Sequence, residues 1–311
     1  MVEQKNTGGG LGGGTAVRAP VPAGDDNGKV LARTQREIFW RRFRRHRLAV
    51  ASAAFLVLVY LAALATPWLV PYEYDEIDYA ALNQGPSFSH PMGTDSLGRD
   101  EMTRVLYGGR VSLTVGLGVG VLSTFVGAAV GILSGYYGRF VDTSLMSFTD
   151  FMLTLPFIPL ILVMGSVFDF TPTTITFALV VLLWMNMARL VRGEVLSVRE
   201  QEYVQAARAV GASDLKIMLR HVLPNVVGVM VVQATLTVAL AILLESAVSY
   251  LGFGIQPPTP SWGNLLTDAR STMTQQPWLT WFPGMMIVIT ALCVNFVGDG
   301  LRDALDPRAV E

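Results

Sequence analysis

The stretch EYVQAARAVGASDLKIMLRHVLPN, residues 202–225, is polar and charged, yet a strongly apolar segment lies on either side of it. Two sets of apolar residues recur here at helical spacing: Leu196, Tyr203, Ala206, Ala207 and Val210, then Leu215, Met218, Leu219 and Val222. Gly211 lies between the sets and permits the left-handed turn that ends a helix, and Ser213 or Asp214 can cap the next one. The pattern predicts two short amphipathic helices joined at a glycine corner. Pro224 should open the next apolar helix, where a missing N–H costs nothing.

The composition indicates a membrane protein. Of 311 residues, 51% are hydrophobic and 15% are charged, whereas soluble domains carry about 25% charged residues. The single cysteine, Cys293, lies in an apolar run and predicts neither a disulfide framework nor a metal cluster. The net charge of −1 gives no reason to expect nucleic-acid binding.

Six segments are long and apolar enough to cross a bilayer, which takes about 20 residues. They are 48–66, 111–133, 144–168, 174–193, 225–250 and 283–300. The third contains Pro156 and Pro159, which neighbouring helices can accommodate inside a membrane. The first starts too far from the N-terminus to be a cleavable signal peptide. The expected fold is therefore an all-α polytopic membrane protein with six transmembrane helices.

The distribution of basic residues predicts the orientation, because inside loops carry excess Lys and Arg. Ten of the 23 basic residues precede the first span, and alternation then places one at 139, six in 189–220 and two in 302–308 on the same side. Four remain outside. Both termini and the 202–225 stretch are therefore expected in the cytoplasm of a multi-pass protein of the cytoplasmic membrane, with external segments at 67–110 and 251–282.

The N-terminal region, 1–47, is expected to be a disordered cytoplasmic tail followed by a basic interfacial helix at 31–47. In that helix Ile38, Phe39 and Phe43 can face lipid while arginines meet anionic headgroups. The tail fits a literal G-x-G-x-x-G, but no strand precedes it, so a dinucleotide site is rejected. GDDNGKV, residues 24–30, is one residue short of a P-loop and lacks its Ser or Thr, so no ATP site is predicted in this chain.

The order of small and apolar residues in the quoted stretch resembles the E-A-A-x3-G-x9-I-x-L-P loop of ABC importer permeases of the type I fold. Gln205 stands for the glutamate of that motif and His221 for its isoleucine, while Glu202 offers an acidic side chain nearby. The resemblance implies that 194–224 is a coupling loop that docks in a cleft of an ATPase. Its site residues would be Glu202, Gln205, Ala206, Ala207, Gly211, Asp214, Leu223 and Pro224.

Seven collinear motifs between residues 39 and 308 resemble a narrower group, the permeases of dipeptide and oligopeptide importers, and within it the second subunit of the permease pair. They are RRFRRHRLAV, HPMGTDSLGRD, GYYGRFVD, EYVQAARAVGASD, RHVLPN, ESAVSYLGFGIQPPTPSWG and GDGLRDALDPR. The resemblance implies a homologous second permease, two ABC ATPases or one fused ATPase, and an extracellular peptide-binding lipoprotein. ATP and Mg would bind to the ATPases, so this chain would carry no catalytic, cofactor or metal site. The group also takes in nickel and glutathione importers, so the substrate stays open.

The expected organisation has four parts, of which residues 1–47, the tail and basic helix, are the first. Residues 48–108 hold the first transmembrane helix and an external segment. Residues 109–300 form a permease core with five transmembrane helices, and 301–311 form a cytoplasmic tail. A self-contained secondary transporter would need internal repeats and broken helices with charge at the midplane. An integral membrane enzyme would need clustered His, Asp or Glu. His46, His90 and His221 are scattered over the chain, so they predict neither a metal site nor a catalytic triad.

Three further features lead to predictions. Gly127, Gly131 and Gly135 repeat every four residues and favour close helix packing. Asp150 and Glu245 are acids in or near spans, so each is either part of the pathway or gate or a buried structural hydrogen-bond partner. The external segments 72–104 and 255–280 carry aromatics that form either a docking surface for the binding protein or a folded cap. These aromatics are Tyr72, Tyr74, Trp262 and Trp278.

The predicted orientation can be tested with two single cysteines. A cysteine at Ser89 should react with a membrane-impermeant thiol reagent in intact cells, because this residue belongs to the first external segment. A cysteine at Ser213 should stay unlabelled until the cells are opened. Labelling of Ser213→Cys alone in intact cells would reverse the orientation.

Overall fold

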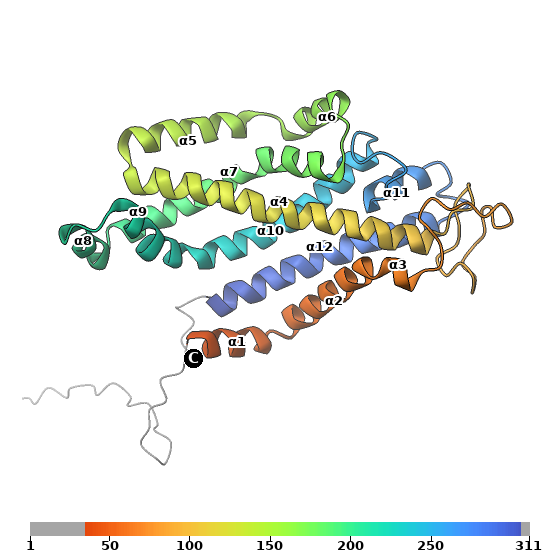
Figure 1. Ribbon diagram of the computed structural model, residues 1–311, viewed down its shortest axis with the longest axis horizontal. Coiled ribbons are helices and arrows are strands. Elements are labelled where there is room, and N and C mark those ends of the chain that lie inside the picture. The colour runs from red at the N-terminus through yellow and green to blue at the C-terminus, as the bar shows by residue number, and fades with distance from the viewer. Residues whose placement is uncertain (1–34, 306–311) are drawn as a thin grey trace, which may run out of the picture.

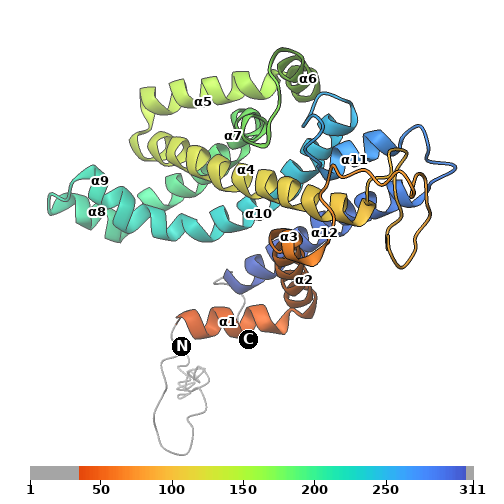
Figure 2. The same ribbon diagram turned by 45° about the vertical axis from the view of Figure 1, so that its right-hand side comes forward.

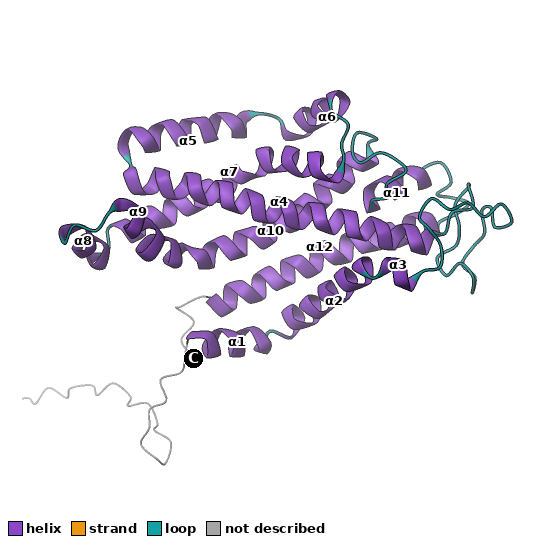
Figure 3. Ribbon diagram, viewed as in Figure 1, coloured by secondary structure: helices purple, strands orange, loops and turns teal. Residues whose placement is uncertain are grey.

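The computed structural model describes residues 35–305. The expectations for the tail before residue 35, including the rejected glycine motif and the near P-loop, lie outside the described residues. So do those for residues 306–311 and for the side chain of Ile38. Within the described range every regular element is helical, apart from one isolated bridge between Thr94 and Asp100 (Figure 3).

The helices run in chain order with short connections, except between α3 and α4 and around α11. Their bounds are α1 Gln35–Arg45, α2 Arg47–Leu64, α3 Thr66–Leu69, α4 Glu101–Tyr137, α5 Arg139–Thr154, α6 Phe157–Val167, α7 Pro172–Arg199, α8 Glu202–Ala209, α9 Asp214–Ile217, a π-helical turn Met218–Val222, α10 Leu223–Tyr250, α11 Trp262–Ala269 and α12 Trp278–Leu305. The expected boundaries at 108/109 and 300/301 fall inside α4 and α12.

The all-α fold with six apolar spans is confirmed, but the third span is broken. Five helices are long and apolar enough to cross a membrane, and α5 with α6 makes a sixth span only as a pair bent by 81°. Pro156 is the N-cap of α6, with an extended backbone. The predicted span over 144–168, which contains both prolines, is therefore present only as a bent pair of helices that is interrupted at Pro156. Pro159 lies in the first turn of α6, where a backbone N–H has no intrahelical partner in any case.

Helix α4 is the centre of the bundle, and its glycines bring it against α7 (Figure 1). A Cβ on Gly131 would lie 2.6 Å from the Ala188 carbonyl oxygen, and one on Gly135 would lie 2.8 Å from the Val195 Cβ. Gly127 meets α7 in the same way. The predicted packing role of this glycine row is confirmed.

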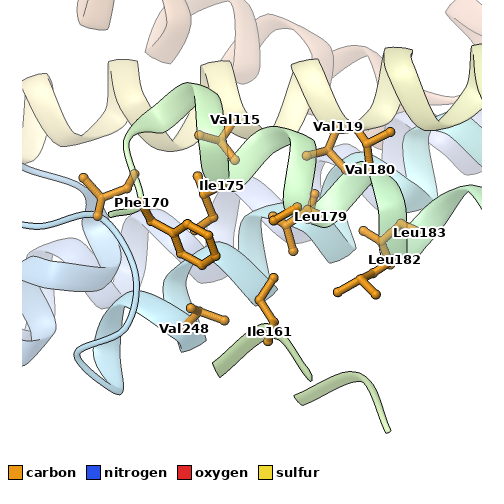
Figure 4. Close-up of a cluster of buried hydrophobic side chains, with 13 residues drawn as sticks. Val115, Val119, Ile161, Phe170, Ile175, Leu179, Val180, Leu182, Leu183 and Val248 are labelled. Atoms are coloured by element: carbon orange, nitrogen blue, oxygen red, sulfur yellow. The ribbon is translucent and has the colours of Figure 1, made fainter. Parts of the chain in front are cut away.

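Branched aliphatic side chains fill the space between α4, α6, α7 and α10. Val115 and Val119 of α4 face Ile175 and Leu179 of α7, and Ile161 of α6 closes the cluster (Figure 4). Ile161, Ile175 and Leu179 are fully buried. This cluster holds the second half of the broken span against the rest of the molecule.

The expected cytoplasmic and external segments lie at opposite ends of the bundle. Helices α8 and α9 lie at one end, while residues 70–100 and α11 lie at the other (Figures 1 and 2). Helix α1 packs along the end of α12, with Phe43 buried against Gly300 and Ala304. The expectation that Phe43 faces lipid is therefore wrong, and Phe39 is likewise partly buried in this contact.

The glycine contact yields a stability prediction. Replacing Gly131 by alanine should lower the thermal unfolding midpoint of the detergent-solubilised protein, because the added Cβ meets the α7 backbone rather than a movable side chain. Overpacking of this kind costs about 1–3 kcal/mol. Gly193→Ala on α7 is the matched control, since no atom lies within 4 Å of its Cβ position. Equal midpoints for the two variants would contradict the close contact.

Candidate functional site

The predicted glycine corner is present between α8 and α9. Gly211 has φ +80°, its N–H bonds to the Arg208 carbonyl oxygen at 3.0 Å, and the Ala212 N–H bonds to the Ala207 carbonyl oxygen at 3.1 Å. These two bonds are the Schellman arrangement that ends a helix on a left-handed residue. Ser213 is the N-cap of α9 by position but makes no side-chain capping bond.

The helix after the corner does not stop before the membrane. Pro224 lies in the first turn of α10, as predicted, but the helical path continues without a break from Asp214 to Tyr250. The π-helical turn Met218–Val222 comes before Pro224, and the Leu223 N–H at its end bonds to the Met218 carbonyl oxygen. The widened turn gives the proline ring room, and the Asn225 side-chain amide bonds to the His221 carbonyl oxygen at 2.6 Å.

The two apolar stripes divide between the inside and the outside of the corner. Val204, Ile217, Met218 and Val222 are buried against α4 and α7. Large apolar side chains of both arms are instead exposed. These are Tyr203 (44% exposed), Val210 (85%), Leu215 (62%) and Leu219 (57%). Ala206 is exposed beside them. The predicted first stripe is also too long, because Leu196 belongs to α7, which ends at Arg199.

Both departures from the resemblance motif have structural partners. The Gln205 side-chain amide donates to the Glu200 carbonyl oxygen at 3.1 Å, at the C-terminal cap of α7. A glutamate carboxylate could not donate this bond. The His221 ring lies 6.2 Å from the Tyr203 ring, so it joins the π-helical turn to α8. Glu202 is exposed in the first turn of α8, where the helix dipole favours a negative charge.

The end of α4 lies against this corner. The Tyr136 hydroxyl donates to Asp214 at 2.7 Å, and the Arg208 guanidinium lies 5.2 Å from the centre of the Tyr136 ring. Arg199 of α7 donates to the Gly135 carbonyl oxygen at 3.1 Å. Tyr136 lies in the GYYGRFVD motif, but its contacts and those of Arg199 are not predictable from the sequence, because hydropathy and spacing do not show which polar residues meet across helices.

The next turn of the bundle adds an ion pair between α5 and α7. Arg192 of α7 donates to both carboxylate oxygens of Asp142, with an Nη2–Oδ2 distance of 2.7 Å. The Ser134 hydroxyl of α4 donates to the same carboxylate. Three helices, α4, α5 and α7, therefore meet at one partly buried acid.

Asp150 and Glu245 lie away from the corner and differ from one another. Asp150 of α5 pairs with Arg189 of α7 at 2.5 Å, and these side chains are 57% and 52% exposed. Glu245 of α10 is fully buried and accepts hydrogen bonds from Ser112 and Ser249, each at 2.9 Å. Each acid is predicted from the sequence to be either part of the pathway or gate or a buried structural hydrogen-bond partner. The structure favours the second role for Glu245, whereas the exposed Asp150 is not a buried partner.

The HPMGTDSLGRD motif at the opposite end forms a compact polar cluster. Asp100 caps α4 by accepting the Thr103 N–H at 2.8 Å and also contacts a His90 ring nitrogen at 2.9 Å. Arg104 bridges Asp95 at 2.9 Å and Asp268 at 2.8 Å. The motif therefore ties the 70–100 segment to the region of α11.

Trp262 is not a surface residue, so its expected role in docking is wrong. It is 0% exposed, and its indole N–H donates to the Val105 carbonyl oxygen at 2.9 Å. Tyr72, Tyr74 and Trp278 are half-buried, and Tyr72 stacks on His90 at 5.2 Å. These aromatics fold the outer segments into a cap. Among residues 35–305, no group of three or more His, Cys, Asp or Glu side chains is placed to hold a metal ion.

Comparisons with known proteins agree with this architecture. Residues 127–311 match the family described as "Binding-protein-dependent transport system inner membrane component", and residues 34–86 match the "N-terminal TM domain of oligopeptide transport permease C". The oligopeptide transport system permease protein OppC of Escherichia coli K12 is 46% identical over 270 residues, which is 86% of this chain and 89% of that protein.

Two further relatives extend the match. OppC of Mycobacterium tuberculosis H37Rv is 44% identical over 284 residues, covering 89% of this chain and 96% of its own. A putative peptide permease protein of Brucella suis biovar 1 is 42% identical over 270 residues, which is 86% of this chain and 89% of that protein. With the six apolar spans and the corner between α8 and α9, these matches establish that the chain belongs to the family of binding-protein-dependent transport system inner membrane components, as an integral multi-pass membrane protein of the type I permease fold.

Proposed function

We propose that this chain is the second permease subunit of an ATP-driven ABC importer that carries di- or oligopeptides across the cytoplasmic membrane into the cell. The observation that carries the proposal is the exposed apolar surface of the α8–α9 corner. Tyr203, Val210, Leu215 and Leu219 are large apolar side chains held outside the bundle on ordered helices. Exposed apolar residues gathered on one element are typical of a protein-binding surface.

The partner at this corner is proposed to be an ABC ATPase. Residues 194–224 serve as the coupling loop, in which Gly211 sets the angle between the arms and Ala206 lets a partner approach closely. Glu202 supplies the acidic side chain at the contact, because Gln205 is engaged with the end of α7. ATP and Mg bind to the ATPases, two separate or one fused, so this chain contributes motion rather than catalysis.

The Asp150–Arg189 pair supports a second permease in the complex. Both side chains are more than half exposed on helices that the hydropathy assigns to the membrane. A charged side chain facing lipid is expensive, so such residues face protein or a water-filled path. We assign the α5–α7 face to the contact with a homologous permease and to the substrate pathway between the two subunits, and Asp150 remains the pathway or gate candidate.

The names of the relatives support peptides as the substrate. Peptides would arrive on an extracellular binding lipoprotein, which meets the outer cap formed by residues 70–100 and the region of α11. This arrangement uses the orientation in which both termini face the cytoplasm. Nickel, glutathione or another small solute is the alternative cargo within the same family, and a self-contained secondary transporter is the less favoured alternative.

Purification of the tagged chain from its native membrane tests the proposal. A homologous permease and an ABC ATPase should co-purify in fixed stoichiometry, and a cysteine at Phe148 on α5 should cross-link to that permease. Reconstituted vesicles should take up labelled oligopeptides only with ATP and binding protein. Uptake without any ATPase would support the secondary transporter, and uptake of nickel or glutathione but not peptides would change the substrate.

The corner itself can be tested at Gly211. Gly211→Val should assemble normally but lose most binding-protein-stimulated ATP hydrolysis, because a β-branched residue at φ +80° costs about 1–3 kcal/mol of backbone strain. No atom lies within 4 Å of the Gly211 Cβ position, so the effect comes from the backbone and not from a clash. Gly211→Asn is the control, since asparagine tolerates this conformation. Wild-type transport by Gly211→Val would remove the strained corner from the mechanism.

A further inference from the structure

One side chain of α4 holds both arms of the α8–α9 corner. The Tyr136 hydroxyl reaches Asp214, the first residue of α9, at 2.7 Å, and the Tyr136 ring lies under the Arg208 guanidinium of α8 at 5.2 Å. Arg208 and Asp214 stand on opposite sides of Gly211. Tyr136 itself is 4% exposed, so no partner protein can reach it directly.

The other contacts between the corner and the bundle are mostly apolar, apart from the hydrogen bond from the Gln205 side chain to the Glu200 carbonyl oxygen at the end of α7. A Cβ at Gly211 would meet no atom within 4 Å, so side-chain packing at this residue does not fix the angle of the turn. Val204 and Ile217 bury apolar surface against α4 and α7. Apolar burial is non-directional, so it does not by itself fix the orientation of the corner relative to α4. A hydrogen bond to a carboxylate has a strong preference for distance and angle.

Helix α4 is suited to carry a displacement from this point. It is one unbroken helix of 37 residues, about 55 Å long. Arg199 of α7 donates hydrogen bonds to the carbonyl oxygens of Gly135 and Tyr136 at 3.1 and 3.3 Å. These bonds join the C-terminal end of α7 to the C-terminal end of α4. At its other end α4 is capped by Asp100 and carries Arg104, which binds Asp268 of α11.

We propose that Tyr136 is the positioning residue that transmits movement of the α8–α9 corner to α4, and through α4 to the outer cap at Arg104 and Asp268. This rests on the proposed function, in which an ATPase moves the corner. Tyr136 touches neither ATP nor substrate, and it acts by fixing the two arms of the corner to α4, which runs from the corner to the outer cap (Figure 1). A shift of Arg208 or Asp214 is thereby a shift of the α4 terminus.

The test uses the complete complex reconstituted in lipid, with ATP hydrolysis measured with and without peptide-loaded binding protein. Tyr136→Phe keeps the ring under Arg208 and removes only the hydroxyl. We expect its stimulation ratio to fall about tenfold, the size that one hydrogen bond to a charged group contributes to an equilibrium. Tyr137→Phe, at the adjacent half-exposed tyrosine, should keep the wild-type ratio.

Substitutions of Asp214, the hydrogen-bond partner of Tyr136, provide the matching part of the experiment. Asp214→Asn retains an oxygen that accepts the hydroxyl and should keep most of the stimulation, whereas Asp214→Ala should lose as much as Tyr136→Phe. The double variant Tyr136→Phe/Asp214→Ala should be no worse than either single one. Additive losses, or full stimulation in Tyr136→Phe, would overturn the proposal.

Two remaining outcomes are also decisive. If Tyr136→Phe does not assemble, the comparison of Asp214→Ala with Asp214→Asn decides, since Asp214 is exposed and its replacement leaves the core intact. Equal stimulation in those two variants would then refute the role of Tyr136. A wild-type complex that binds no ATPase, or that the loaded binding protein never stimulates, would instead refute the proposed function itself.

Discussion

The close approach of α4 and α7 through Gly127, Gly131 and Gly135 is the constraint on which the rest of the structure depends. Lipid tails are as apolar as leucine, so transmembrane helices gain little by hiding apolar surface from one another. They associate where small residues let backbones come near enough for dense van der Waals contact. Because a Cβ at Gly131 would already lie 2.6 Å from a carbonyl oxygen of α7, this contact leaves the two helices a single register. That register brings Arg192 and Arg199 of α7 to the end of α4.

A polar cluster lies at each end of α4. At one end Asp100 caps the helix and Arg104 joins two aspartates from distant parts of the chain. At the other end Tyr136 meets the corner between α8 and α9. Most of the intervening residues are apolar or small, and Ser112 among them donates to the buried Glu245 of α10. The helix therefore connects two polar clusters across a region where polar contacts are expensive.

Much of the fold follows from local sequence physics. Hydropathy predicts the spans because only helices satisfy their own backbone in lipid, and Gly211 is predictable because few other residues accept its backbone angles. The predictions that are wrong have a common cause. At each of these residues the local sequence permits two conformations or environments, and contacts with residues distant in the chain decide between them. A proline inside an apolar run can be accommodated or can end the helix: Pro224 stays within a helix beside a widened turn, whereas Pro156 separates α5 from α6. An aromatic in an outer segment can face a partner or fill a local core, and Trp262 does the latter. The contacts of Tyr136 are invisible in sequence because Asp214 lies 78 residues away.

The break at Pro156 has a consequence for how the chain enters the membrane. The two halves of the third span have 16 and 11 residues, and neither alone reaches the length of about 20 that a stable transmembrane helix needs. Ile161 of the second half packs in a cluster with residues of α4, α7 and α10, and α7 and α10 are synthesised after it. The final position of this short helix therefore depends in part on contacts that form only after α7 and α10 have been synthesised.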